Sequence, residues 1–156
     1  MDLINIETIN KEAEIAIAVK LEAVDCAKFA EIMTEGYQKL WAYLAKCGKQ
    51  MAGAPYCKYT NASEDFMKFD IEMGIPVSEL LPEQGEFFMS RTCAGKAITA
   101  THKGAYKDIE QTYNPMMQYL VENKLESTGV YYDYYLNNPA DTPESELLTK
   151  VVFPIK

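Results

Sequence analysis

The feature that most constrains the fold of this chain is an order of strand, helix, strand and strand that occurs twice. Residues 53–59 (GAPYCKY) match residues 129–135 (GVYYDYY), and residues 74–77 (GIPV) match residues 152–155 (VFPI). We interpret this similarity as an internal duplication. A single unit of three strands and one helix cannot bury both of its apolar faces, so we expect the two units to share one core and to leave a groove between them.

In the first unit, residues 15–21 (IAIAVKL) alternate between larger apolar side chains and smaller or charged ones, which predicts a half-buried strand. Asp25 can cap the helix of about five turns that follows. Its apolar positions recur at three- and four-residue steps until Gly48: Phe29, Met33, Tyr37, Leu40 and Leu44. Residues 53–60 and 66–77 then predict the two strands of a hairpin.

The second unit repeats this order. Residues 86–101 predict one long strand, and a helix that ends near Lys124 follows. The apolar side chains of this helix are Tyr106, Ile109, Tyr113, Met116, Met117 and Leu120. Because Pro115 lies inside the helix and lacks a backbone donor, we expect a kink or a break there. Residues 129–136 and 147–155 predict the last two strands.

These patterns predict the α+β class. We expect duplicated βαββ modules, one at about residues 12–78 and the other at about 85–156, that form an antiparallel sheet with two main helices and a central groove. A length of 156 residues with 48% hydrophobic residues is typical of one domain with its own core, so we expect a single domain over residues 1–156.

Charge and hydropathy exclude several classes of partner. A net charge of −8 offers no basic surface to a phosphate backbone, so direct nucleic-acid binding is not expected. The longest apolar runs, such as residues 15–19, are too short to cross a bilayer, and we expect no membrane partner. The opening segment, residues 1–11, is polar and does not resemble an export signal, which favours a cytoplasmic location.

The residues that hold cofactors in other proteins are sparse in this chain. The four cysteines lie far apart, and His102 is the only histidine, so the spacing of a metal site is missing. No glycine-rich phosphate loop follows a predicted strand. We therefore expect no metal and no cofactor, and four free thiols.

Tyrosine stands out, with 11 residues, and four of them surround a single aspartate in residues 131–135 (YYDYY). Strand alternation places Tyr131, Asp133 and Tyr135 on one face. Aromatic rings offer rigid contact area to flat apolar ligands and attract cations, so a carboxylate among rings favours an organic cation. Asp133 could equally point to solvent, opposite Tyr132 and Tyr134, because alternation alone does not decide which face is buried.

Two further polar residues have plainer interpretations. Glu72 shares a strand face with Lys68 and Asp70, which favours a solvated face. His102 stands at a strand end beside Lys103, where a surface or turn histidine is more typical than a catalytic one. The sequence assigns no catalytic residue.

Three segments carry a resemblance to a known family: residues 102–106 (HKGAY), the helix with Tyr113, and residues 133–139 (DYYLNNP). Together with the duplication, they resemble the GyrI-like effector-binding domains over essentially the whole chain. The resemblance implies a ligand groove flanked by two βαββ modules. A family motif similar to Glu-x-Tyr-Leu-x-x-Pro implies that a pocket carboxylate contacts lipophilic cationic drugs. Here Asp133 stands at the position of that glutamate and Tyr135 at the position of the tyrosine.

Our main hypothesis is therefore a stand-alone protein that binds hydrophobic or cationic small molecules. Asp133, supported by Tyr135, is expected to fix the cation. The expected walls of the pocket are Trp41, Tyr37, Tyr59, Tyr106, Tyr113, Tyr131 and Met117. Some relatives hydrolyse cyclopropane-bearing compounds, which makes a hydrolase of electrophilic toxins the first alternative. The second is an inhibitory protein that acts on a protein partner, as the family name implies.

Overall fold

The duplicated pattern corresponds to two units, each with one long helix and four antiparallel strands. A computed structural model describes residues 5–156, so the first four residues of the polar opening segment lie outside the described residues. One unit comprises residues 13–93, and the other joins the described residues up to Glu12 to residues 94–156. The predicted α+β class is confirmed.

The unit of residues 13–93 carries the longer helix. Its elements are β2 (Ile15–Asp25), α1 (Phe29–Lys46), β3 (Tyr56–Thr60), β4 (Lys68–Pro76) and β5 (Phe88–Arg91). The strands lie in the order β3-β4-β2-β5. Between Asp25 and α1 the chain makes one 3-10 turn, and the amide of Ala27 donates to the Asp25 carboxylate at 2.9 Å. Asp25 therefore caps this turn and not α1 itself, whose N-cap, Lys28, makes no side-chain capping hydrogen bond.

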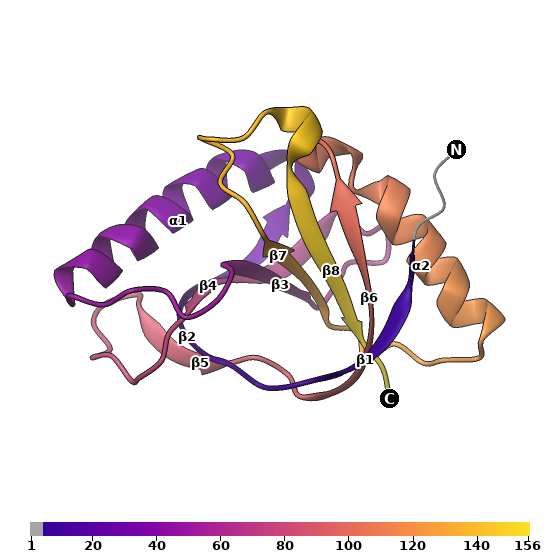
Figure 1. Cartoon of the computed structure of the whole chain (residues 1–156), viewed down its shortest axis with the longest axis horizontal. Helices are drawn as coiled ribbons and strands as arrows, with labels where there is room; N and C mark the ends of the chain where they lie inside the picture. The colour runs from indigo at the N-terminus through magenta and orange to yellow at the C-terminus, as the bar shows by residue number, and fades with distance from the viewer. Residues whose placement is uncertain (1–4) are drawn as a thin grey trace. The chain divides into compact units, whose positions relative to one another are not determined.

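Helix α1 packs on β2 and β4 (Figure 1). Gly36 faces this sheet and makes close packing possible, because a Cβ atom there would meet the end of the Met73 side chain. The predicted half-buried strand is only partly right. All of residues 16–19 in β2 are buried, which means that both faces of this stretch are covered.

The connection of β3 to β4 is held by the Asp70 carboxylate. The Asn61 side-chain amide donates to Oδ2 at 2.7 Å, and the backbone amide of Ala23 donates to Oδ1 at 2.9 Å. These two hydrogen bonds, that of Asn61 first, lower the pKa of Asp70 below its usual range.

A pH dependence of stability follows from Asp70. Because its pKa is lower in the folded chain, its contribution is present above the unfolded-chain value of about 3.9 and is lost as the pH falls through the folded value. We expect Asp70→Asn to lower the free energy of unfolding at pH 7, and the difference from wild type to shrink below about pH 4. Urea unfolding at pH 7 and pH 3 measures this. An equal difference at both pH values would contradict it, and Asp141→Asn, in an exposed loop, is the control.

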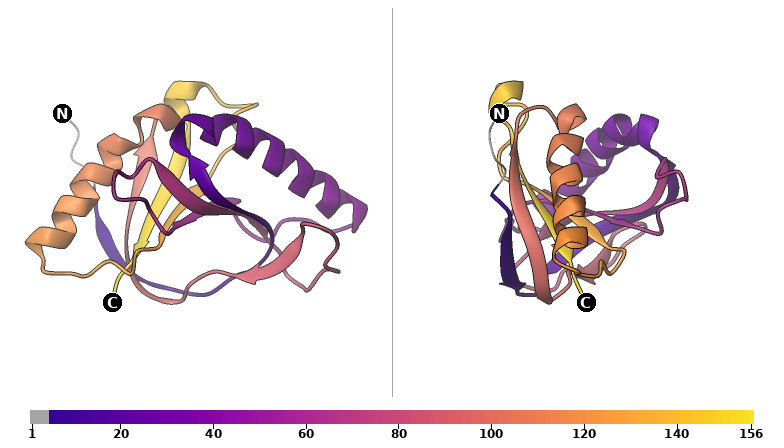
Figure 2. Two further views of the ribbon diagram at one scale, coloured as in Figure 1. Left: turned by 180° about the vertical axis from the view of Figure 1, so that it is seen from behind. Right: turned by 90° about the vertical axis from the view of Figure 1, so that its right-hand side faces the viewer.

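The other unit begins with a strand that the sequence did not indicate. Its elements are β1 (Glu7–Lys11), β6 (Gly95–Lys103), α2 (Glu110–Glu122), β7 (Tyr131–Tyr135) and β8 (Leu148–Pro154). They form the order β1-β6-β8-β7, with all pairs antiparallel. A 3-10 turn of Tyr106–Asp108 precedes α2. Figure 2 shows α2 running alongside β6.

One apolar cluster holds α2 on its sheet. Its buried members are Ile98, Ala100, Met116, Leu120, Val151 and Phe153. Helix α2 runs through Pro115 as one element, so there is no break at this position, and the expected kink stays a prediction. Pro115 is the sixth residue of α2, and its side chain is exposed.

The predicted strand of residues 86–101 is two strands, β5 and β6, which belong to different units because the unit boundary falls between Cys93 and Ala94. The four cysteines form no disulfide bond with one another. No helix among residues 5–156 is long and apolar enough to span a membrane.

Candidate functional site

Asp133 stands at the centre of β7, and its side chain is only 3% exposed. In the register of β7 and β8 it faces Val151, which lies in the apolar cluster beneath α2. Paired residues of antiparallel strands point to the same side of a sheet, so Asp133 points toward the helix. Strand alternation alone left open whether Asp133 faces solvent, and the structure shows that its carboxylate is buried.

The hydroxyl of Tyr113, on α2, donates to this carboxylate. Tyr113 Oη lies 2.5 Å from Asp133 Oδ1 and 2.6 Å from Oδ2, so it stands almost midway between the two oxygens. A buried carboxylate is costly unless donors compensate for the lost hydration. Short O–H···O⁻ bonds of this kind are among the stronger hydrogen bonds in proteins.

Aromatic rings surround this pair. The Phe153 ring lies 5.7 Å from the Tyr113 ring and 4.9 Å, edge to face, from the Tyr131 ring. The Tyr135 ring packs edge-on against Tyr106 at 5.4 Å. Burial raises the pKa of the Tyr106 hydroxyl, which therefore stays protonated at neutral pH.

Six of the nine predicted site residues thus lie in one unit, on the side of the sheet that carries α2 or on the segment leading into α2. They are Asp133, Tyr135, Tyr131, Tyr106, Tyr113 and Met117. Met117 is partly buried at the border of the apolar cluster. Strand and helix periodicity together with the family motif selected these residues, and their role in binding stays a prediction.

The remaining three predicted residues, Tyr37, Trp41 and Tyr59, belong to the other unit. Tyr59 is 7% exposed, and its ring packs against Phe29 and Phe69 at 5.6 and 5.7 Å. The Tyr37 hydroxyl donates to a backbone carbonyl of β3, and Trp41 is 41% exposed. The groove that the sequence predicts between the units stays a prediction.

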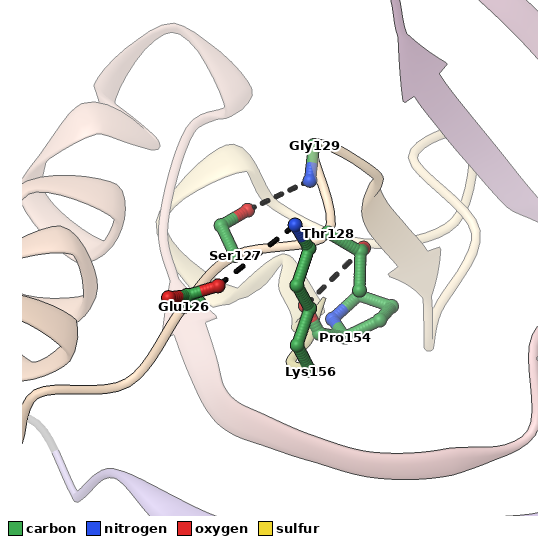
Figure 3. A network of polar contacts seen from close by, with 6 residues as sticks. All are labelled: Glu126, Ser127, Thr128, Gly129, Pro154 and Lys156. Atoms are coloured by element: carbon green, nitrogen blue, oxygen red, sulfur yellow. Dashed lines mark hydrogen bonds and ion pairs between the residues drawn. The ribbon is translucent and has the colours of Figure 1, made fainter.

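The segment before β7 is tied to the end of β8 (Figure 3). The Thr128 amide and hydroxyl both donate to the Pro154 carbonyl at 3.3 Å. The Lys156 amide donates to the Glu126 carbonyl at 2.9 Å, and the Gly129 amide donates to Ser127 Oγ at 3.0 Å. These bonds fix where β7 begins, and with it the position of Asp133.

The opposite face of β7 carries a second aromatic pair, which the sequence did not assign to a site. The rings of Tyr132 and Tyr134 lie 5.9 Å apart and nearly parallel. The ammonium of Lys11, at the end of β1, lies 5.6 Å from the centre of each ring. This cation–π contact links the first and last strands of the order β1-β6-β8-β7.

The prediction that Glu72 lies on a solvated face is wrong. It is 8% exposed, and its Oε2 accepts from Tyr56 Oη at 2.7 Å and from Ser90 Oγ at 2.8 Å. The tyrosine comes from β3 and the serine from β5, so the network spans the sheet of this unit. The pattern of β4 alone could not show this, because the face of Glu72 is covered by residues of other segments.

Removal of one donor from this network has a measurable cost. Tyr56→Phe deletes the hydroxyl that bonds to Glu72, and we expect it to lower the free energy of unfolding by about 1.5 to 3 kcal/mol, the usual range for a hydrogen bond to a charged group. Urea unfolding provides the measurement. Tyr119→Phe, on α2, is the matched control, and a loss no larger than that of the control would contradict the prediction.

His102 is also buried, contrary to the expectation of a surface or turn histidine. Only 4% of it is exposed. Its Nε2 lies 2.9 Å from the Ala105 carbonyl, to which it donates, and its Nδ1 lies 2.9 Å from Thr112 Oγ1 on α2. His102 therefore ties the end of β6 to the first turn of α2, next to Tyr113.

Two surface recesses, of about 360 and 500 Å³, lie between α1 and residues 79–87. Both are lined by Tyr43, Lys46 and Gln84, and neither is lined by a predicted site residue. Among the described residues, no group of three or more histidine, cysteine, aspartate or glutamate side chains is placed to hold a metal ion.

Comparison with known proteins found one matching family and several solved structures with the same fold. The model of the GyrI-like small molecule binding domain matches residues 6–156. No curated protein matches significantly. The crystal structure of the EcmrR C-terminal domain is similar with a TM-score of 0.85 and 18% identity, over 99% of both chains.

Two further structures share the fold. A hydrolase encoded by lin2189 from Listeria innocua has a TM-score of 0.70 and 13% identity, over 97% of this chain and 91% of that one. SAV2435, solved bound to tetraphenylphosphonium, has a TM-score of 0.65 and 11% identity, over 99% and 94%. At these identities the likeness concerns the fold.

Proposed function

Because the chain belongs to the GyrI-like small-molecule binding domain family, we propose that it binds lipophilic organic cations, with Asp133 as the anionic partner. The observation that carries the proposal is the buried carboxylate of Asp133, held by Tyr113 among aromatic rings. The structure of SAV2435 with tetraphenylphosphonium, a lipophilic cation, supports the choice of ligand class.

The physical basis is the strength of charge pairing away from water. Two unit charges 4 Å apart attract by about 4 kcal/mol at an effective dielectric constant of 20, against about 1 kcal/mol in bulk water. The rings of Tyr113, Tyr131 and Phe153 add apolar contact area, and their faces attract a cation. A lipophilic cation satisfies both features, whereas an inorganic cation would leave the rings without contact.

A thermal-shift experiment on the full chain tests this proposal. A ligand that binds only the folded state stabilises it by about 2.7 kcal/mol at a concentration of 100 Kd, which for a chain of this size raises Tm by about 5 to 10 °C. We expect such a rise with tetraphenylphosphonium and with rhodamine 6G. The neutral triphenylphosphine oxide is the control, and an equal rise with it would argue against recognition of charge.

A second candidate function is hydrolysis of strained electrophiles such as cyclopropanes, and the Tyr113–Asp133 hydrogen bond favours it. Asp133 would take a proton from water, whose oxygen would bond to a ring carbon as the ring C–C bond breaks. Tyr113 would give its proton to the displaced carbon or its electron-withdrawing substituent, and the proton held by Asp133 would return to Tyr113. Turnover by the wild type that Asp133→Asn abolishes would establish this activity.

A further inference from the structure

We infer that Tyr113 makes the Asp133 site selective for organic cations that carry no N–H donors. The inference rests on the proposed function and narrows its ligand class. Quaternary ammonium and phosphonium groups would be accepted, while guanidinium and amidinium groups on a similar apolar body would be disfavoured.

The geometry of the hydrogen bond carries the inference. Tyr113 Oη lies 2.5 Å and 2.6 Å from the two oxygens of Asp133, which places the hydroxyl in front of the carboxylate rather than at one side of it. A guanidinium or amidinium group binds a carboxylate through two parallel N–H···O bonds, one to each oxygen. The tyrosine hydroxyl occupies the position that such a group needs.

The position of Tyr113 is fixed by its neighbours. Its ring packs against Phe153, and Met116 lies in the buried apolar cluster of the same unit. The preceding residue, Thr112, is buried and bonds to His102, which in turn donates to the Ala105 carbonyl. This buried network holds the backbone beside Tyr113, and rotation of the ring would break its packing against Phe153, so moving the hydroxyl away from the carboxylate is costly.

The two classes of cation place different demands on this arrangement. A phosphonium or quaternary ammonium group has no donors and interacts with Asp133 through charge, so it needs no acceptor position of its own. A guanidinium group that enters without displacing Tyr113 leaves N–H donors unpaired in an apolar site, which weakens its binding. Two ligands that share one apolar body, a diphenylmethyl group, and differ only in the cationic group would therefore bind with different affinities.

Calorimetric titration of the full chain with benzhydryltrimethylammonium and with benzhydrylguanidinium tests the inference. We expect the wild type to bind the quaternary cation at least about tenfold more tightly. In Tyr113→Phe, the ratio should fall to about one or below, because the guanidinium gains access to both oxygens. Tyr119→Phe, on the same helix, should keep the wild-type ratio.

The outcomes separate this inference from the function on which it rests. Equal or tighter binding of the guanidinium by the wild type would overturn the inference, and this measurement needs no variant. A parallel weakening of both ligands in Tyr113→Phe would also overturn it, since the hydroxyl would then only hold Asp133 in place for either cation. If neither cation bound the wild type, or if Asp133→Asn left both affinities unchanged, the proposed function itself would fail.

Discussion

Asp133→Asn is expected to raise the Kd for tetraphenylphosphonium by roughly 30- to 150-fold. The variant removes one charge and keeps the size of the side chain, and its carbonyl oxygen can still accept from Tyr113. The lost attraction between unit charges at about 4 to 5 Å corresponds to about 2 to 3 kcal/mol after partial screening by solvent. Isothermal titration calorimetry measures the change directly.

Asp141→Asn is the control for a change in net charge. It also removes one negative charge, but from an exposed loop of the same unit. Exposed charges separated by more than about 10 Å are largely screened at 0.1 M salt, so we expect the Kd of this variant to stay within about twofold of the wild type. Equal effects of the two variants would mean that the ligand responds to overall charge and not to Asp133.

Gly74→Ala is expected to lower the free energy of unfolding by about 3 kcal/mol or more. A Cβ atom at this position would lie 2.5 Å from both Cζ and the hydroxyl oxygen of Tyr56, which is fully buried. The ring cannot move without breaking its bond to Glu72, so the substitution combines overpacking with the loss of a hydrogen bond to a charged group. Urea unfolding measures the loss.

Gly36→Ala provides the comparison. Its Cβ atom would meet the flexible end of the Met73 side chain, which can move, and alanine is favoured over glycine inside a helix by about 1 kcal/mol. We expect the net change to stay within about 1 kcal/mol of zero. If Gly74→Ala were no more harmful than Gly36→Ala, the contact of Tyr56 with Gly74 would not constrain the sheet.

Periodicity in the sequence predicted most elements because each has one apolar side. The steps of three and four residues from Phe29 to Leu44 gave α1, and the cap at Asp25 marked where the turn before it begins. The strand β1 was missed because it has only five residues, most of them polar, and because its pairing partners in β6 lie 84 (Lys11 to Gly95) to 92 (Glu7 to Thr99) positions further along the chain. Pairing over such a separation leaves no local signal.

The sequence predicted which strand carries the candidate site and which residues of that strand share a face. Alternation put Tyr131, Asp133 and Tyr135 together, and the family motif singled out Asp133. Neither indicated which face of β7 lies beneath α2, because that depends on Val151 and Phe153 of β8. Glu72 was misjudged for a related reason, since its partners, Tyr56 and Ser90, come from two other strands.

The central claim is that a buried carboxylate gives this chain a preference for positive charge. Tetraphenylphosphonium and tetraphenylborate have nearly the same shape and opposite charges, so titration of the wild type and of Asp133→Asn with both ions isolates that preference. We predict that the wild type binds the phosphonium at least about 100-fold more tightly than the borate, and that Asp133→Asn loses most of this difference. Similar affinities of the wild type for both ions, or the same preference in both proteins, would contradict the claim.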